Sequence, residues 1–215
     1  MKSYAVALLG LATIVGVAHS QTSTVCQPLD VVFVIDNSGS IRDNNDADCQ
    51  DQPEASCDNW RRMRNFVMQL IDDIAPNAET GGETRFGAVS FGNEGAPTRM
   101  LFDLTSDRNA ARDTINTTPH EFHSTATAEG IEIMRNDVFN GPNDRPSIPN
   151  VAIIITDGVP TRPEGNPIQA AIDEANAAKA DDIYILTVGV TSNIDEETIR
   201  SLSSPAPGEN EPVSS

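Results

Sequence analysis

Short runs of apolar, β-branched residues alternate along the chain with segments in which apolar residues recur every three or four positions. The runs predict strands at residues 30–35, 85–91, 99–103, 151–156 and 183–189. Residues 31–35 and 151–155 are apolar throughout, which is typical of strands covered by helices on both faces. The pattern therefore predicts an α/β fold, a Rossmann-like, doubly wound and mainly parallel sheet with helices on both faces and these two strands at its centre.

Apolar stripes of helical period lie between the predicted strands. They run from Trp60 to Ile74, from Ala128 to Val138 and from Pro167 to Ala178. Asn193, with Glu196 three residues later, resembles a capping box. This box predicts a short last helix that ends near Leu202.

Both ends of the chain and one insertion depart from this alternation. Residues 1–20 combine a lysine, 14 consecutive apolar or small residues and small residues at the cleavage position, so we expect a signal peptide and a secreted, extracellular protein. This stretch is too short to span a bilayer, for which about 20 residues are needed. Residues 21–28 are then a linker, residues 29–204 the domain, and residues 205–215 a disordered tail rich in proline, serine and glutamate. An acidic insertion occupies residues 43–58.

Charge and cysteine content narrow the class of partner. The 32 acidic and 14 basic residues give a net charge of −18, which argues against nucleic acid or an anionic membrane as a partner. In an oxidising compartment we expect Cys49 and Cys57, within the insertion, to form a disulfide. The third cysteine, Cys26, then has no predicted partner in this sequence. Asn116-Thr117-Thr118 is a sequon for N-glycosylation.

Oxygen-bearing side chains follow both central strands. The first strand ends in Asp36-Asn37-Ser38-Gly39-Ser40, and the second ends in Thr156-Asp157-Gly158. If these strands are neighbours, Asp36 and Asp157 converge at the carboxyl edge of the sheet, where open α/β sheets bind ligands. Two carboxylates with several hydroxyls make a hard, all-oxygen site that suits a divalent ion, with Mg²⁺ as the first choice.

These motifs, with a threonine on a loop before a helix between them, resemble the metal-ion-dependent adhesion site of the von Willebrand factor A (VWA) family. The resemblance covers nearly the whole domain and implies the VWA fold. It implies that Ser38, Ser40 and Thr125 are metal ligands, that Asp157 is a carboxylate of the site and that Asp36 often acts through water. It further implies a protein without catalytic activity, in which Mg²⁺, or else Mn²⁺ or Ca²⁺, binds an Asp or Glu of a collagen-like or other matrix protein.

The end of the chain departs from the family pattern. Family members continue after the short last helix with one more strand and a final helix, which this sequence lacks, so the affinity switch that some members operate through that helix is in doubt. In many secreted members a cysteine before the first strand pairs with one after the last helix. Cys26 therefore implies either a fragment of a longer protein or an intermolecular disulfide.

Two other functions are compatible with the residues. An acidic matrix or mineral-associated scaffold would collect Ca²⁺ over its surface and would not depend on the site. A metal-dependent hydrolase is less favoured, because neither a nucleophile elbow nor a phosphate-binding glycine loop accompanies the carboxylates.

Two smaller motifs have only part of a metal-binding pattern. Residues 43–48 lack the glycine and the distal glutamate of a calcium loop, so we interpret them as a solvated acidic loop. His120 and His123 lack a third zinc ligand nearby in sequence, so we expect both at the rim of the site, in contact with the partner.

Overall fold

The computed structural model describes residues 27–41, 58–74, 83–93, 98–190 and 194–206. Its centre is a five-stranded sheet with the strand order β3-β2-β1-β4-β5. The strands are β1 (Asp30–Asp36), β2 (Arg85–Phe91), β3 (Arg99–Thr105), β4 (Asn150–Thr156) and β5 (Ile183–Gly189). Edge strand β3 is antiparallel to β2, and every other pair is parallel. The predicted strands and the mainly parallel sheet are confirmed.

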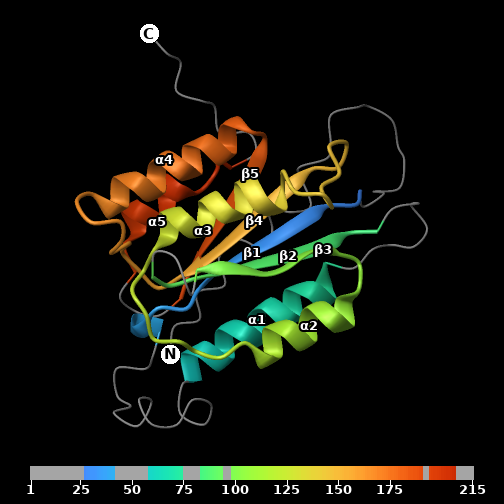
Figure 1. Cartoon of the computed structure of the whole chain (residues 1–215), viewed down its shortest axis with the longest axis horizontal. Coiled ribbons are helices and arrows are strands. Elements are labelled where there is room, and N and C mark those ends of the chain that lie inside the picture. Colours follow the sequence, from blue (N-terminus) through green and yellow to red (C-terminus); the bar gives the residue numbers. More distant parts are fainter. Residues whose placement is uncertain (1–26, 42–57, 75–82, 94–97, 191–193, 207–215) are drawn as a thin grey trace.

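Helices cover both faces of this sheet (Figure 1). One face carries α1 (Asp58–Asp73) and α2 (Arg108–Thr117), and the other carries α3 (Thr127–Ile133), the π-helical segment η4 (Met134–Val138), α4 (Pro167–Ala180) and α5 (Glu196–Leu202). Along β1, Val31 and Phe33 belong to the core on the α1 side, and Val32 and Val34 to the core on the α3 side. Burial on both faces explains why this strand is apolar throughout.

The sequence pattern did not predict α2. This helix begins after Asp107, whose carboxylate accepts a hydrogen bond from the backbone N–H of Ala110 at 2.9 Å. It buries only Ala111 and Ile115. Two buried apolar positions in ten residues make only a short apolar stripe, so the cap is the clearest signal of this helix.

The short last helix is present, but its cap differs from the prediction. The residue that caps α5 is Asp195, two positions after the predicted cap, and its side chain accepts hydrogen bonds from two amides of the first turn. Beyond α5, Ser204 lies along the outer edge of β5, where its backbone N–H donates to the carbonyl oxygen of Ile185 at 2.8 Å. Up to residue 206, where the described part of the chain ends, no further strand or helix follows.

Several predicted segments lie outside the described residues. These are the signal peptide, most of the linker with Cys26, nearly all of the acidic insertion with Cys49 and Cys57, and most of the predicted tail. They stay predictions.

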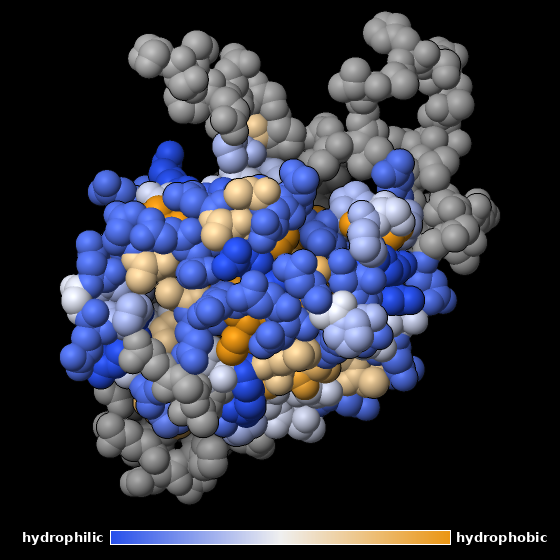
Figure 2. Space-filling model, turned by 45° about the horizontal axis from the view of Figure 1, so that its top comes forward, coloured by the Kyte–Doolittle hydropathy of each residue, from blue (hydrophilic) through white to orange (hydrophobic). Residues whose placement is uncertain are grey.

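The surface of the described residues is mostly polar. Figure 2 shows one face on which hydrophilic residues predominate and hydrophobic residues form small, scattered groups. The exposed large hydrophobic residues are Val159 and Ile194. Single exposed residues of this kind are normal and do not by themselves mark a binding site. None of the described helices is long and apolar enough to cross a membrane.

Candidate metal site

The two aspartates of the sequence motifs lie at neighbouring strand ends. β1 and β4 are adjacent and parallel, with Ile35 paired to Ile155, so Asp36 and Asp157 follow at the same edge of the sheet. Asp36 is fully buried and Asp157 is 6% exposed. The convergence expected from the sequence is therefore present in the structure.

Hydrogen bonds connect the two aspartates through the serines of the first motif. The backbone N–H of Ser38 donates to Asp36 Oδ1 at 2.9 Å, and the hydroxyls of Ser38 and Ser40 lie 2.9 Å apart. Ser40 Oγ in turn donates to Asp157 Oδ1 at 3.0 Å. Ser40 lies on the short helix η1 (Gly39–Ile41), which is anchored by the fully buried Ile41. Four of the five predicted site residues thus form one continuous contact.

Thr125 lies on the adjoining loop, at the start of α3. Its backbone N–H donates to Thr161 Oγ1 at 2.9 Å, and its carbonyl oxygen accepts from the backbone N–H of Thr161 at 2.9 Å. Two residues earlier, the carbonyl oxygen of His123 accepts from Gly39 N–H at 2.8 Å. These bonds join the Thr125 loop to the first motif and to the segment that follows the second motif. No hydrogen bond among the described residues joins Thr125 directly to the other four site residues.

The electrostatics of this edge favour a cation. Burial raises the pKa of Asp36 to about 6, and the negative charge of Asp157 adds to the rise. Burial also raises the pKa of Asp157. In the described part of the chain neither carboxylate forms an ion pair with a basic side chain. A divalent cation between them would remove both the repulsion and the unpaired charge.

Sequence reasoning missed several residues that support the site. Thr156 donates from its hydroxyl to Asp36 Oδ2 at 2.6 Å, and Thr161 fastens Thr125. Asn37 is fully buried and bonds to the loop before Thr125. Thr156 is next to Asp157 in sequence and could have been suspected, whereas Asn37 looks like an ordinary turn residue.

His120 corrects an expectation. It was predicted at the rim in contact with a partner, but it is 4% exposed and packs between Trp60 and Phe122. Residues next to a surface loop can still be core residues when aromatic neighbours cover them. His123 is partly exposed. Among the described residues, no group of three or more His, Cys, Asp or Glu is placed to hold a metal ion.

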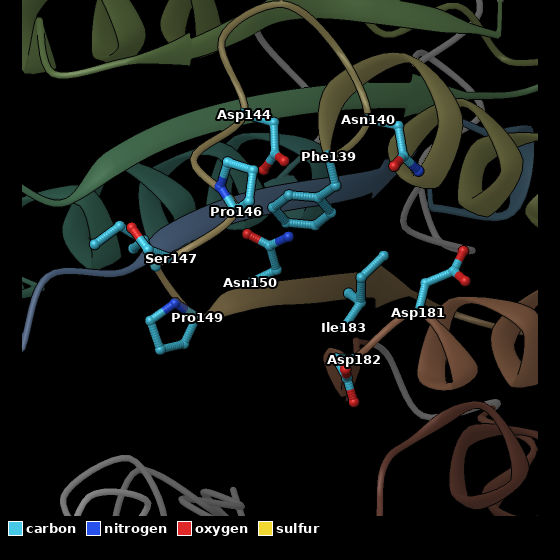
Figure 3. Close-up of a pocket in the computed structure, with 11 residues that line it drawn as sticks. Phe139, Asn140, Asp144, Pro146, Ser147, Pro149, Asn150, Asp181, Asp182 and Ile183 are labelled. Carbon is cyan, nitrogen blue, oxygen red and sulfur yellow. The ribbon is translucent and has the colours of Figure 1, made fainter.

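A pocket of about 360 Å³ lies at the opposite edge of the sheet (Figure 3). Its lining includes Asn150 and Ile183, which begin β4 and β5, together with Asp144 and the ring of Phe139. Figure 3 shows the side chains of Asp144 and Asn150 directed into the same space beside that ring. Because it lies at the amino ends of the strands, this pocket contributes no residue to the candidate metal site.

Comparison with known proteins decides the family. The profile of the von Willebrand factor type A domain matches residues 30–213, which is most of the chain. The chain belongs to this family. The VWA fold inferred from the sequence motifs is therefore confirmed.

Relatives and solved structures agree with this assignment. The chain is 26% identical to human matrilin-1 over 200 residues, which cover 88% of this chain and 34% of matrilin-1. It is 21% identical to the mouse collagen alpha-4(VI) chain over 175 residues, which cover 80% of this chain and 6% of that one. The chain thus spans about a third or less of these relatives. The structure of mussel byssus proximal thread matrix protein 1 with a zinc-occupied MIDAS motif has a TM-score of 0.62 at 19% identity, and covers 83% of this chain and 42% of that one.

Proposed function

We propose that this VWA domain binds a divalent metal ion, and that the ion binds an acidic side chain of an extracellular protein. The site comprises Asp36, Ser38, Ser40, Thr125 and Asp157. The observation that carries the proposal is the continuous hydrogen-bonded contact from Asp36 through both serines to Asp157. It joins oxygen donors from two adjacent strand ends into one small, all-oxygen site. Such donor sets suit hard cations, and Mg²⁺ is our first choice over Mn²⁺ and Ca²⁺.

The roles of the two carboxylates differ in this proposal. Asp36 accepts from the Ser38 amide on one oxygen and from the Thr156 hydroxyl on the other, so it is suited to orient the loop and to act through water. Asp157 contacts Ser40, the most exposed residue of the set, and is suited to bind the ion directly. With few carboxylates and several neutral hydroxyls, the bound ion keeps positive charge. It would supply a coordination position for a carboxylate of the partner.

The class of partner is inferred from the comparisons and the composition. Among the relatives is a collagen chain, and a solved neighbour is a thread matrix protein whose MIDAS motif holds zinc. The predicted signal peptide favours secretion. We therefore propose adhesion to a matrix protein, without catalysis, as the role of the domain.

Thermal unfolding with Mg²⁺, Mn²⁺, Ca²⁺ or chelator tests the metal site. A ligand present at 100 times its Kd stabilises the folded state by about 2.7 kcal/mol, which is about 5 to 10 °C in Tm for a domain of this size. We expect this shift in the unmodified chain and in Asp113→Ala, an exposed aspartate of α2, but not in Asp157→Ala. Equal metal shifts in Asp157→Ala and Asp113→Ala would refute the assignment.

Binding to collagen-coated and other matrix-coated surfaces tests the role of the ion. Attachment should require metal, disappear in chelator and disappear in Asp157→Ala. Attachment that persists in chelator would contradict the proposal.

A second candidate is an acidic scaffold that collects calcium, which the net charge of −18 favours. It predicts many weak Ca²⁺ sites per chain that survive Asp157→Ala. Calorimetric titration with Ca²⁺ separates the two, because adhesion through the site predicts one strong site that the substitution removes.

A further inference from the structure

The loop that leads into Thr125 runs against the loop that carries Ser38 and Ser40, which we call the metal-binding loop. Residues 118–124 connect α2 to Thr125, and His123 forms a parallel β-bridge with Ser38. A Cβ at Gly39 would lie 3.4 Å from the carbonyl oxygen of Phe122, which is ordinary van der Waals distance, so the two loops pass in close contact there. Phe122 itself has a φ of 57°, in the left-handed region that non-glycine residues rarely adopt. Its conformation is therefore imposed by the surrounding contacts.

Asn37 fastens this loop to the end of β1. Its side-chain oxygen accepts from the backbone N–H of Glu121 at 2.8 Å, and its side-chain nitrogen donates to the carbonyl oxygen of Pro119 at 3.1 Å. The same nitrogen lies 3.2 Å from Ser90 Oγ on β2. A fully buried amide with partners on this loop and on β2 holds both at fixed distances from the end of β1.

His120 lies in the middle of the fastened loop and contacts the metal-binding loop directly. Its Nε2 is 2.8 Å from the carbonyl oxygen of Ser38. A carbonyl oxygen can only accept, so Nε2 carries the hydrogen and donates. The ring stacks on Trp60, with centroids 5.1 Å apart and planes 13° apart, and it lies 4.0 Å from the ring of Phe122. These two rings fix the direction of the donor.

We propose that His120 is a positioning residue for the metal site, an inference that rests on the proposed function. Ser38 has its amide held by Asp36 and its carbonyl held by His120, so both of its peptide groups are fixed. This places the Ser38 hydroxyl beside that of Ser40 before an ion arrives. Groups that orient metal ligands in this way typically change metal affinity by about 10- to 100-fold when they are removed.

Two substitutions separate the hydrogen bond from the packing of the ring. His120→Phe keeps an aromatic ring between Trp60 and Phe122 but removes the donor, and His120→Gln keeps a side-chain N–H but removes the ring. We expect the Kd for Mn²⁺, measured by calorimetry, to rise about 10- to 100-fold in His120→Phe. The Kd for Mn²⁺ of His120→Gln should lie within a few-fold of that of the unmodified chain, even if the Tm of this variant in chelator is lower.

A matched control accounts for general destabilisation. Ile71→Val removes one methylene from the fully buried core on the α1 side and removes no hydrogen-bonding group. It should lower the Tm in chelator without changing the Kd for Mn²⁺.

Three outcomes would overturn the inference, and one of them also removes the proposed function. An unchanged Kd in His120→Phe would show that the donor is not needed. Greater weakening in His120→Gln than in His120→Phe would assign the effect to the packing of the ring. Failure of the unmodified chain to bind Mn²⁺ would remove the proposed function, and this inference with it, whereas the first two outcomes leave the proposed function intact.

Discussion

The two ends of β1 each carry a fully buried aspartate, and the two carboxylates are compensated in opposite ways. At the amino end, Arg145 Nε lies 3.1 Å from both carboxylate oxygens of Asp30. At the carboxyl end, Asp36 accepts hydrogen bonds from a backbone amide and a hydroxyl. The nearby carboxylate of Asp157 repels its negative charge. Asp30 is neutralised by the chain itself, whereas no basic side chain among the described residues pairs with Asp36, and in the proposed function that role falls to an ion from solution.

Removing the internal cation should give the largest effect. Arg145→Leu leaves the Asp30 carboxylate buried without its partner, and we expect the free energy of unfolding in urea to fall by about 3 to 5 kcal/mol. The loss should be the same with metal and with chelator, because the pair lies at the other end of the strand. Replacing both residues by leucine should recover much of the loss, since an apolar pair has no charge to desolvate. A loss below about 1 kcal/mol in Arg145→Leu would mean that solvent screens the pair and that the contrast does not hold.

Neutralising Asp36 should raise the free energy of unfolding in chelator, whereas Arg145→Leu lowers it. Because burial and Asp157 raise its pKa from 3.8 to about 6, the folded state holds the proton more tightly than the unfolded state. The unmodified chain therefore loses stability as the pH rises from about 4 to 6, and the loss persists above that range. At pH 7.5 in chelator, Asp36→Asn should be more stable than the unmodified chain by on the order of 2 kcal/mol.

Urea unfolding at several pH values checks this sign. The advantage of Asp36→Asn in chelator should shrink as the pH is lowered towards 4, and saturating Mg²⁺ should remove or reverse it at pH 7.5. Asp113→Asn, at an exposed position on α2, is the charge-matched control and should change little. If Asp36→Asn were less stable than the unmodified chain in chelator at pH 7.5, the carboxylate would be serving the fold, as Asp30 does.

The sequence could predict those site residues that directly follow a predicted strand. Asp36, Ser38 and Ser40 follow an apolar strand directly, and Asp157 follows another, so the strand pattern was enough to bring them to one edge of the sheet. The fold class followed from the same alternation.

The supporting contacts could not be predicted, because their partners are distant in sequence. Asp30 and Arg145 are 115 positions apart, and His120 is 82 positions from Ser38. No local pattern distinguishes a histidine that orients a metal-binding loop from one on the rim. Helix α2 escaped prediction for a different reason, since it buries only two apolar residues and its apolar stripe is short.

The smallest effect on the free energy of unfolding is expected at an ion pair on the surface. It tests whether burial is what makes the pair of Asp30 and Arg145 important for stability. Arg112 on α2 bonds to Asp72 on α1, and these side chains are 36% and 46% exposed. Exposed pairs contribute about 0.2 to 1 kcal/mol and are screened by salt, so Arg112→Gln should change the free energy of unfolding by less than about 1 kcal/mol. The change should shrink further in 1 M NaCl, whereas the effect of Arg145→Leu should persist there, because the Asp30 carboxylate is out of reach of the salt. If Arg112→Gln and Arg145→Leu lowered the free energy of unfolding equally, charge pairing itself, and not burial, would determine how much an ion pair stabilises the fold. The absence of such a cation beside Asp36 in the described part of the chain would then no longer single out that end of β1.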